Sequence, residues 1–403
     1  MLIFENKDKK IVKSKEYNSV FDKETGFFAR WGETKEEDPQ SAPYPEIADI
    51  EISSGKCHNA CPFCYKQNTA NGELHNMTLN EFKKVFHTIA HTVVEIIADN
   101  IDEIKLINEI NPTIYEKCNT KKEMIDTIMS DSKLPIKSIK IYNMGLLTQI
   151  AFGITSPIDN PDFFKMMEYS REFDVIPNYT IKATDMTEDI ADKTVKLCGA
   201  CAVSFCSDKT VTYNAVNMLL DKGLKQTNIH QVAMETTFER IKETINDVAD
   251  KNGIHGLNAL VLLKYKPKGT NAGKFKPLTK EQYKEIFELA HERKVPIGFD
   301  SCSAPIYLDM IKDNPKADLL SSYAEPCESS LFSIYVNSYC EVYPCSFSEN
   351  EIRKDNNWID GINLLNINAK DFQKDVWQGE RLTNFKNRLL NNNRNCPMFN
   401  LED

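Results

Sequence analysis

The sequence predicts an α/β fold whose parallel sheet forms a barrel or a partial barrel. Two observations support this prediction. Stretches with strand-like alternation and stretches with helical spacing follow each other in six units between residues 47 and 299. The chain also has 403 residues, enough for a barrel and a smaller module, and 41% of them are hydrophobic. Strand–helix alternation implies right-handed βαβ units with parallel strands.

The expected elements follow in chain order. Residues 1–45 are polar and turn-rich, and we expect two short strands within 17–32 and a proline-containing linker at 36–45. The expected strands of the sheet are residues 47–52, 148–154, 175–183, 200–206, 228–234, 257–265 and 295–299. The expected helices are residues 79–94, 162–173, 189–197, 211–221, 238–250 and 280–293. In sheets of this kind, catalytic groups lie at the carboxyl ends of the strands.

Residues 95–142 interrupt this alternation. We expect an insertion there, with helices of its own around residues 104–110 and 121–129. Its cysteine, Cys118, has no metal-binding partner nearby in the sequence, so we expect an ordinary packing residue.

Charge and composition exclude several classes of protein. The formal net charge is -10, whereas broad nucleic-acid binding needs a basic face. No apolar run reaches the roughly 18 residues of a membrane-spanning helix, and the first residues do not resemble a signal peptide. We therefore expect a soluble, cytoplasmic protein that binds neither membranes nor nucleic acid in bulk. In such a chain the 12 cysteines should stay reduced, which points to metal binding or redox chemistry.

Three cysteines follow the first expected strand with the spacing C-x3-C-x2-C: Cys57, Cys61 and Cys64. Thiolates are the natural ligands of iron–sulfur clusters. A [4Fe–4S] cubane held by three thiolates keeps one iron open, and a small molecule can bind that iron directly. The alternatives are a redox C-x-x-C pair and a structural zinc site, which usually needs four ligands. His58 is a poor fourth zinc ligand because it adjoins Cys57.

The cysteine spacing, the strand before it and Phe63 next to the last cysteine resemble the radical S-adenosylmethionine (SAM) superfamily. The resemblance implies a partial (β/α)6 TIM-type barrel, which we assign to residues 46–300. It also implies a [4Fe–4S] cluster with SAM as cofactors and a low-potential electron donor as partner. In this family the reduced cluster cleaves SAM to a 5′-deoxyadenosyl radical, which abstracts hydrogen from the substrate.

Other SAM contacts are implied by position in the family pattern. Gly153 and Pro157 match the ends of a turn that contacts the SAM amino group. The acidic residue of that turn is absent, so the hydroxyls of Thr155 and Ser156 are the expected acceptors. An ordinary strand-to-helix turn is the alternative.

Two later strands carry further candidates. Ser204 matches a family contact to ribose, and Val232 lies in a segment that resembles an adenine contact. Cys206 and His230 are candidates for catalysis at the mouth of the barrel, although a lone strand histidine is more often structural. Four further polar residues have no predicted place in a cavity. They are Tyr179, Asp300, Glu325 and Glu328.

A second set of cysteines follows the last barrel strand. Residues 331–336 and 341–343 are predicted to form a hairpin with Cys340 at its turn, pointing away from the open end. This region, residues 301–403, resembles the twitch or SPASM extension of radical SAM proteins. The resemblance implies a hairpin-plus-helix domain with a second, auxiliary [4Fe–4S] cluster. Its expected ligands, with zinc as the alternative metal, are Cys302, Cys327, Cys345 and Cys396.

Three functions remain open from the sequence. The first is a radical SAM enzyme that modifies a peptide or protein side chain, by analogy with relatives that carry an auxiliary cluster. The second is a radical SAM dehydrogenase or remodelling enzyme for a small alcohol, sugar or nucleotide, with the insertion at 95–142 as a lid. The third is a zinc or iron–sulfur scaffold without catalysis.

Overall fold

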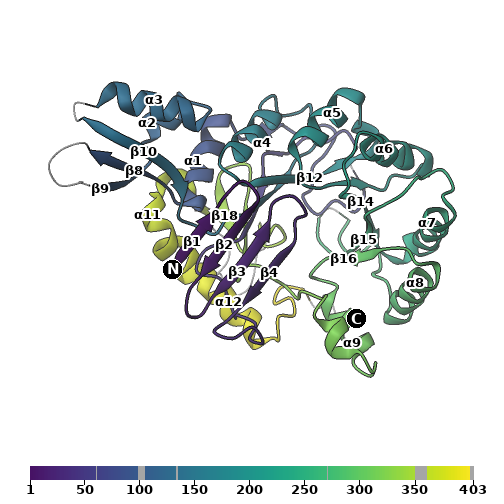
Figure 1. Ribbon diagram of the computed structural model, residues 1–403. Coiled ribbons are helices and arrows are strands. Elements are labelled where there is room, and N and C mark those ends of the chain that lie inside the picture. Colours follow the sequence, from purple (N-terminus) through teal and green to yellow (C-terminus); the bar gives the residue numbers. More distant parts are fainter. Residues whose placement is uncertain (60, 99–104, 133–134, 270, 350–360, 400–403) are drawn as a thin grey trace.

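The computed structural model describes residues 1–59, 61–98, 105–132, 135–269, 271–349 and 361–399 (Figure 1). Its centre is a ten-stranded sheet with the order β16-β15-β14-β13-β12-β11-β5-β17-β18-β19. The pairings from β16 to β17 are parallel, whereas β18 pairs antiparallel with β17 and β19. The barrel strands are β5 (Ile47–Glu51), β11 (Gln149–Gly153), β12 (Ile176–Lys182), β13 (Cys201–Ser204), β14 (Thr227–Ala233), β15 (Ala259–Lys264) and β16 (Ile297–Phe299).

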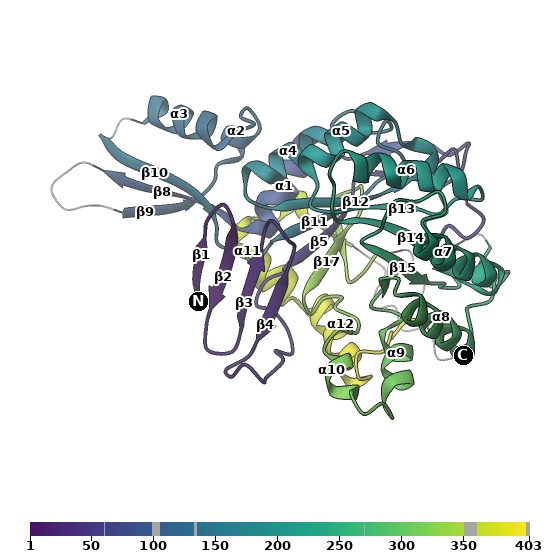
Figure 2. The ribbon, with the colours of Figure 1, turned by 45° about the vertical axis from the view of Figure 1, so that its right-hand side comes forward.

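The helices that alternate with the barrel strands cover one face of the sheet, as Figure 1 and Figure 2 show. The covering helices are α1 (Leu79–Ala90), α4 (Phe163–Glu172), α5 (Glu188–Leu197), α6 (Lys209–Asp221), α7 (Phe238–Asp250) and α8 (Lys280–Arg293). Along β14, every second residue is buried and the residues between, such as His230 and Val232, are partly exposed. Because the two outer strands, β16 and β19, do not pair with each other, the barrel stays open. The predicted α/β fold with a partial barrel is therefore confirmed.

Helix α1 shows how the local sequence sets the element boundaries. Thr78 and Glu81 form a reciprocal capping box at its start, and apolar side chains such as Phe82 and Phe86 are fully buried. The helix ends at His91, which has a left-handed backbone conformation (φ 47°). The expected helix at 79–94 was therefore too long. Its last residues are β-branched and begin strand β8 (Thr92–Ala98) instead.

The insertion forms a small antiparallel sheet that projects from the barrel (Figure 1 and Figure 2). Its remaining elements are β9 (Lys105–Glu109), α2 (Pro112–Tyr115), α3 (Lys121–Asp131) and β10 (Ile136–Asn143), with the strand order β10-β8-β9. The helix expected at 121–129 is confirmed as α3. The helix expected around 104–110 is wrong over the described residues, because β9 pairs with β8. Cys118 is buried, as expected of a packing residue.

The insertion connects the end of α1 to the start of β11. In a βαβ unit, the end of a helix and the start of the next strand lie at the amino edge of the sheet. The cysteine loop follows the carboxyl end of β5, at the opposite edge. The insertion therefore lies on the wrong side of the sheet for a lid over that loop.

The N-terminal residues form a four-stranded antiparallel sheet rather than a single hairpin. Its strands are β1 (Leu2–Glu5), β2 (Lys9–Lys13), β3 (Asn18–Asp22) and β4 (Phe28–Trp31). The buried Lys10 donates hydrogen bonds to the carbonyl oxygens of Gly145 (2.9 Å) and Leu147 (3.1 Å). These bonds fix the small sheet to the segment that leads into β11.

The C-terminal region continues the barrel sheet. Strand β17 (Ser333–Val336) pairs with β5, and β18 (Glu341–Tyr343) turns back from it, as the sequence predicted. Cys340 occupies the turn with a φ of 63°. The other strand and the α-helices of this region, among the described residues, are β19 (Ile362–Asn363), α9 (Ala304–Ile311), α10 (Ala317–Ser321), α11 (Ala369–Asp371) and α12 (Glu380–Asn391).

Candidate functional site

The loop that carries Cys57, Cys61 and Cys64 leaves the carboxyl end of β5 and closes on itself. The short strands β6 (Ser53–Ser54) and β7 (His75–Asn76) pair at its base. The Cys57 backbone N–H donates to the Thr69 carbonyl at 2.8 Å. Gly55 has a φ of 86°, and a Cβ there would lie 2.0 Å from the Glu73 carbonyl oxygen. Only glycine fits at that position, because any side chain would force the loop open.

The three thiols of this loop are free and lie near one cation. Cys57 is buried, and Cys61 and Cys64 are half-buried. The Lys182 ammonium, at the carboxyl end of β12, donates a hydrogen bond to Cys57 Sγ. Burial raises the pKa of Cys61, and Lys182 opposes that rise, whereas the other two cysteines add to it. The loop thus brings its sulfur atoms together beside Lys182.

Within the described ranges, no three His, Cys, Asp or Glu side chains are grouped closely enough to share a single metal ion. The ligands of a [4Fe–4S] cubane need not meet at one point, because each thiolate binds a different iron. Three free thiols on one loop supply the donor set of a cubane with one open iron. The residues present therefore fit such a cluster.

A row of polar side chains crosses the open face of the barrel next to the loop. Lys182 is in register with Ser204, and Ser204 is in register with His230. The Thr180 hydroxyl lies 3.2 Å from His230 Nδ1. Burial lowers the pKa of His230 to about 4, against a smaller opposite effect of Asp300. His230 is therefore neutral near pH 7, and Val232 follows it on the same face of β14.

The turn after β11 separates its two predicted hydroxyls. Thr155 donates to Asp159 Oδ2 at 2.6 Å, so its hydroxyl is already engaged. The Ser156 hydroxyl is buried and has no partner among the described residues. A buried hydroxyl without a partner is costly unless a ligand satisfies it. Gly153 pairs with Glu51 of β5, and a Cβ there would lie 3.1 Å from the Glu51 Cα.

Cys206 does not belong to the row of Lys182, Ser204 and His230. Its thiol lies 2.9 Å from the Asp208 carbonyl oxygen and 3.3 Å from the Thr212 hydroxyl, at the start of α6. It therefore interacts with the first turn of that helix rather than with Ser204 or His230.

An ion-pair network ties the cysteine loop to the C-terminal hairpin. Lys66, two residues after Cys64, pairs with Glu51 at 3.0 Å and with Glu349. Tyr335 of β17 donates to Glu51 at 3.0 Å. Burial raises the pKa of Glu51, and Lys66 opposes that rise. The loop is thus anchored to the segment that carries the second set of cysteines.

The second set of cysteines converges on one cavity of about 290 Å³. Its lining includes Cys302, Cys327, Cys345 and Cys396. Burial raises the pKa of Cys345 to about 12 and also raises the pKa values of Cys302 and Cys327. Cys340 does not line this cavity; it is buried at the hairpin turn. Four thiols around one cavity have the donor set of a second cubane.

Arg394 holds two of these cysteine segments together. Its Nε donates to the Cys327 carbonyl at 3.1 Å, and its Nη2 pairs with Glu325. Because Arg394 is two residues before Cys396, these bonds place Cys396 beside the segment of Cys327.

Two solved structures with bound SAM have a fold similar to that of this chain. Native anSMEcpe with bound AdoMet and Cp18Cys peptide is 14% identical, with a TM-score of 0.50, and the match covers 84% of this chain and 83% of that chain. Streptococcus suis SuiB bound to S-adenosylmethionine is 11% identical, with a TM-score of 0.50, over 84% of this chain and 65% of SuiB. Escherichia coli coproporphyrinogen III oxidase (HemN), a radical SAM enzyme, is 13% identical over 63% of this chain and 54% of HemN, with a TM-score of 0.36. No family model and no curated protein matches the sequence.

The chain therefore has the same fold as these two proteins solved with bound SAM. In this fold the C-x3-C-x2-C loop lies at the carboxyl edge of the partial barrel, beside Lys182 and the row of Ser204 and His230.

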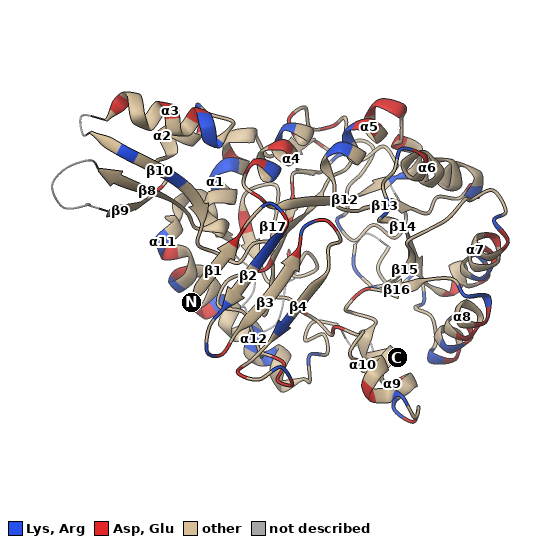
Figure 3. Cartoon of the chain, viewed as in Figure 1, with Lys and Arg blue, Asp and Glu red and all other residues tan. Residues whose placement is uncertain are grey.

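Positive and negative side chains are interspersed in the view of Figure 3. Among the described residues, no helix combines the length and apolar character needed to cross a membrane.

The other polar candidates from the sequence lie apart from the row. Tyr179 is buried and bonds the Thr194 hydroxyl of α5 at 2.7 Å, on the helix side of the sheet. Glu325 and Glu328 pair with Arg30 of β4 at 2.7 and 3.0 Å. Tyr179 and Glu325 stabilise the fold around the site, and Glu328 also lines the cavity of the second cysteine set.

Asp300 and Asp49 belong to the cavity of the second cysteine set. Asp300 pairs with Lys266 and accepts from the Ser303 hydroxyl at 2.7 Å. Asp49 is exposed to this cavity and is in register with Tyr335 of β17. Asp49 and Lys182 were not among the residues predicted from the sequence. The alternation of side chains along the two strands could have found both residues. It puts Asp49 on the same face as Glu51, and Lys182 on the same face as Thr180.

Proposed function

We propose that this protein is a radical SAM enzyme that modifies a peptide or protein side chain. The observation that carries the proposal is the position of the free thiols of Cys57, Cys61 and Cys64. They lie at the carboxyl edge of an open parallel barrel, where enzymes built on such sheets place their catalytic groups. The peptide substrate is supported by anSMEcpe, which has the same fold and was solved with AdoMet and a peptide.

The residues around the loop have separate roles in this proposal. Cys57, Cys61 and Cys64 hold the cluster, with Phe63 packed edge-on against Phe275 at 6.3 Å between ring centroids. Bound SAM and the cluster would supply the 5′-deoxyadenosyl radical that abstracts hydrogen. The Lys182 ammonium offsets the negative charge of the thiolates.

The contacts to SAM come from the strands next to the loop. The Ser156 hydroxyl and the Gly153 backbone accept from its amino group, because Ser156 has no other described partner. Thr155 orients the turn through Asp159. Ser204 and Val232 contact the nucleoside. His230 is neutral near pH 7 and lines the substrate space as a hydrogen-bonding group.

The second cysteine set holds an auxiliary [4Fe–4S] cluster in this proposal. Four thiolates saturate a cubane, so the cluster exchanges electrons instead of binding substrate. Its cavity lies next to the first loop, because Phe347 lines the cavity and stacks on Tyr65, the neighbour of Cys64.

The test is anaerobic reconstitution of the full chain, followed by dithionite and SAM. We expect about eight irons per chain, two cubanes, together with 5′-deoxyadenosine. Cys61→Ala should lose about four irons and all cleavage, and Cys345→Ala should lose about four irons but retain cleavage. Cys340→Ser is the matched control and should keep both the full iron content and SAM cleavage. Zinc in place of iron, with intact SAM, would refute the proposal and support the scaffold.

The substrate is tested separately with the reconstituted enzyme. Candidate precursor peptides are incubated with SAM and reductant and analysed by mass spectrometry. A change in mass that requires SAM supports peptide modification. SAM cleavage with no change in any peptide, but with turnover of a small alcohol or sugar, would replace the peptide with a small molecule.

A further inference from the structure

Two buried polar atoms close to the first cysteine loop have no hydrogen-bond partner among the residues that the structure describes. They are Oγ of Ser156 and Oδ2 of Asp185. The Asp185 side chain is only 6% exposed. A buried carboxylate oxygen without a donor is costly, because it has lost its contact with water and has gained no hydrogen bond in return. The Ser156 hydroxyl has a role in the proposed function, whereas Asp185 has none.

Asp185 lies next to the first cysteine loop. Its Oδ1 lies 3.2 Å from Nε2 of His58, the residue after Cys57, and accepts from the Thr184 hydroxyl at 3.2 Å. Asp185 follows the end of β12 by three residues, and Lys182 at that end donates to Cys57 Sγ. The carboxylate therefore contacts the cysteine loop from the carboxyl edge of β12.

The two unpartnered atoms follow neighbouring strands of the sheet. Ser156 is in the turn after β11, and Asp185 ends the short turn after β12. These strands are parallel, with Phe152 in register with Tyr179, and β11 lies between β12 and β5. The carboxyl ends of parallel strands meet at one edge of the sheet. Both atoms therefore lie at the edge where the cysteine loop leaves β5.

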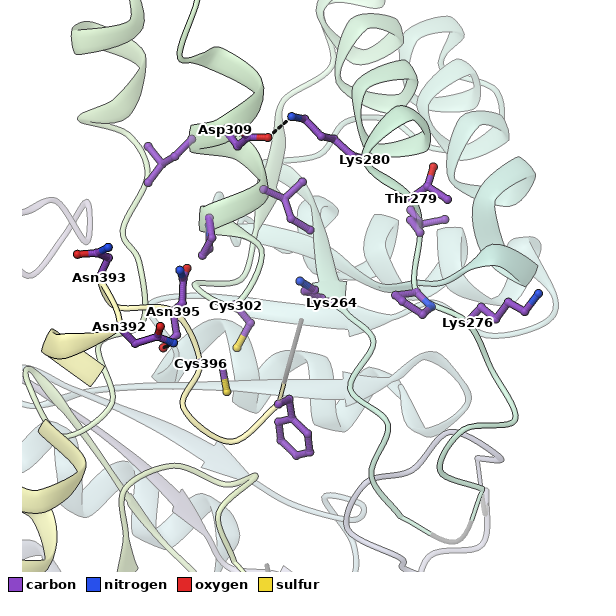
Figure 4. A pocket seen from close by; sticks show the side chains of 16 residues that line it. Lys264, Lys276, Thr279, Lys280, Cys302, Asp309, Asn392, Asn393, Asn395 and Cys396 are labelled. Atoms are coloured by element: carbon purple, nitrogen blue, oxygen red, sulfur yellow. Dashed lines mark hydrogen bonds and ion pairs between the residues drawn. The ribbon is translucent and has the colours of Figure 1, made fainter. Parts of the chain in front are cut away.

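A carboxylate elsewhere in the chain shows the more usual arrangement. Asp309 lines the large cavity of Figure 4 and pairs with Lys280 and, at 2.8 Å, with Lys312. By contrast, no lysine or arginine of the described ranges pairs with Asp185, and its ion-pair contact is to His58. A histidine is only partly protonated near neutral pH. The negative charge of Asp185 is therefore left for a ligand.

The chemistry of these atoms defines the group that they bind. A carboxylate oxygen only accepts hydrogen bonds, so its partner must be a donor, and its charge favours a cation. Residues 153–157 contain neither aspartate nor glutamate, so in the proposed function they offer the SAM amino group neutral acceptors only. A protonated amine has three N–H donors and a positive charge. Asp185 has the acceptor and the negative charge that this turn lacks.

We propose that Asp185 binds the α-amino group of SAM through Oδ2, together with the Ser156 hydroxyl. The inference rests on the proposed function and adds the charged residue of the amino-group site. His58 fixes the carboxylate through Oδ1, which leaves Oδ2 for the amine.

The experiment compares two ligands that the enzyme does not cleave. They are S-adenosylhomocysteine and its analogue with hydrogen in place of the α-amino group. Isothermal titration calorimetry measures both dissociation constants with the anaerobically reconstituted full chain, without reductant. We expect the wild-type protein to bind S-adenosylhomocysteine about ten- to a hundredfold more tightly, the range given by hydrogen bonds to charged groups. Asp185→Asn should remove most of this preference and leave the affinity for the analogue unchanged.

Two further variants and a second readout make the test specific. Asp309→Asn makes the same change at the paired carboxylate of Figure 4 and should keep the preference. Asp185→Glu keeps the charge and should retain part of the preference. A bound ligand raises the melting temperature of the folded protein. S-adenosylhomocysteine should therefore raise it less in Asp185→Asn than in the wild type, whereas the analogue should raise both equally.

An unchanged preference in Asp185→Asn would overturn the inference and leave the proposed function standing. Equal weakening of both ligands, with the loss of about four irons, would overturn it too, because Asp185 would then serve the cysteine loop. Weaker binding of acetyl-lysine amide in Asp185→Asn, with the preference for S-adenosylhomocysteine intact, would assign the carboxylate to a substrate amine and overturn the contact to SAM. A wild-type protein that binds neither nucleoside ligand would refute the SAM site of the proposed function itself.

Discussion

The ring of Tyr65 stacks on the ring of Phe347, with 4.2 Å between their centroids and 29° between their planes. Tyr65 follows Cys64 of the first cysteine loop, and Phe347 is two residues after Cys345 of the second set. The Lys66–Glu349 ion pair lies beside this stack. The two cysteine regions are thus one packed unit, although about 280 residues separate them along the chain.

This stack predicts an energetic coupling between the two regions. In a double-mutant cycle with Tyr65→Leu and Phe347→Leu, the coupling free energy of unfolding should be about 0.5–1.5 kcal/mol. Chemical denaturation of the four proteins measures it. The stacked pair Tyr283 and Phe287 lies within helix α8 and serves as a reference for local coupling. Additive effects of Tyr65→Leu and Phe347→Leu would show that the stack does not couple the two regions.

The contacts of Arg394 predict that its removal costs the proposed auxiliary cluster selectively. Arg394→Ala removes the bond to the Cys327 carbonyl and the pair with Glu325, so Cys396 is no longer held in place. We expect the reconstituted protein to keep about four irons and to cleave SAM, with the auxiliary iron lost. Arg394→Lys should restore little, since a lysine cannot reproduce the forked geometry. Arg293→Ala, at the α7–α8 surface pair, is the control. Equal loss of iron from both sites in Arg394→Ala would contradict this role.

The sequence predicted the elements of the barrel because each depends on local periodicity. Helix α7 was expected at 238–250, and the structure has Phe238–Asp250. The C-x3-C-x2-C loop was also visible, because its ligands lie close together in the chain. By contrast, β9 was mistaken for a helix, since a short apolar run fits both periods and only its pairing with β8 decides.

The neighbours of the site depend on the order and register of strands, which no local pattern gives. Lys182 reaches Cys57 because β12 is two strands from β5 in the sheet. The position of the insertion depends on the edge of the sheet from which it extends. It extends from the amino edge, so it cannot cover the cysteine loop at the carboxyl edge. The grouping of Cys327 with Cys396 likewise depends on Arg394 and the path of the C-terminal segment.

The buried His87 predicts how stability changes with pH. It is 2% exposed, and burial lowers its pKa to about 3, with Lys83 and Lys84 acting in the same direction. The unfolded chain therefore takes up this proton first, near pH 6.5. Stability should be complete above that pH and should fall as the pH drops toward about 3, by up to about 1.4 kcal/mol per pH unit.

His87→Gln should flatten this dependence, because the glutamine cannot titrate. Chemical denaturation at several pH values between about 4 and 7.5 measures the slope of the free energy of unfolding against pH. This is roughly the range over which the histidine of the unfolded chain titrates. His255→Gln, at an exposed position, is the matched control and should leave the slope unchanged. An unchanged slope in His87→Gln would mean that other groups dominate acid unfolding.

The position of Lys182 predicts that its removal changes the reduction potential of the cluster proposed at Cys57, Cys61 and Cys64. Its ammonium donates to Cys57 Sγ and lies near Cys61, so it stabilises negative charge at the loop. Reduction adds one negative charge to the cluster, and the loss of a nearby cation makes that step less favourable. Lys182→Met should therefore lower the midpoint potential, whereas Lys182→Arg should largely preserve it. A redox titration followed by electron paramagnetic resonance measures the potential without substrate. Lys193→Met, on the outer surface of α5, is the control for a general change in charge. An unchanged potential in Lys182→Met, with iron content intact, would show that the lysine does not face the cluster once it is bound.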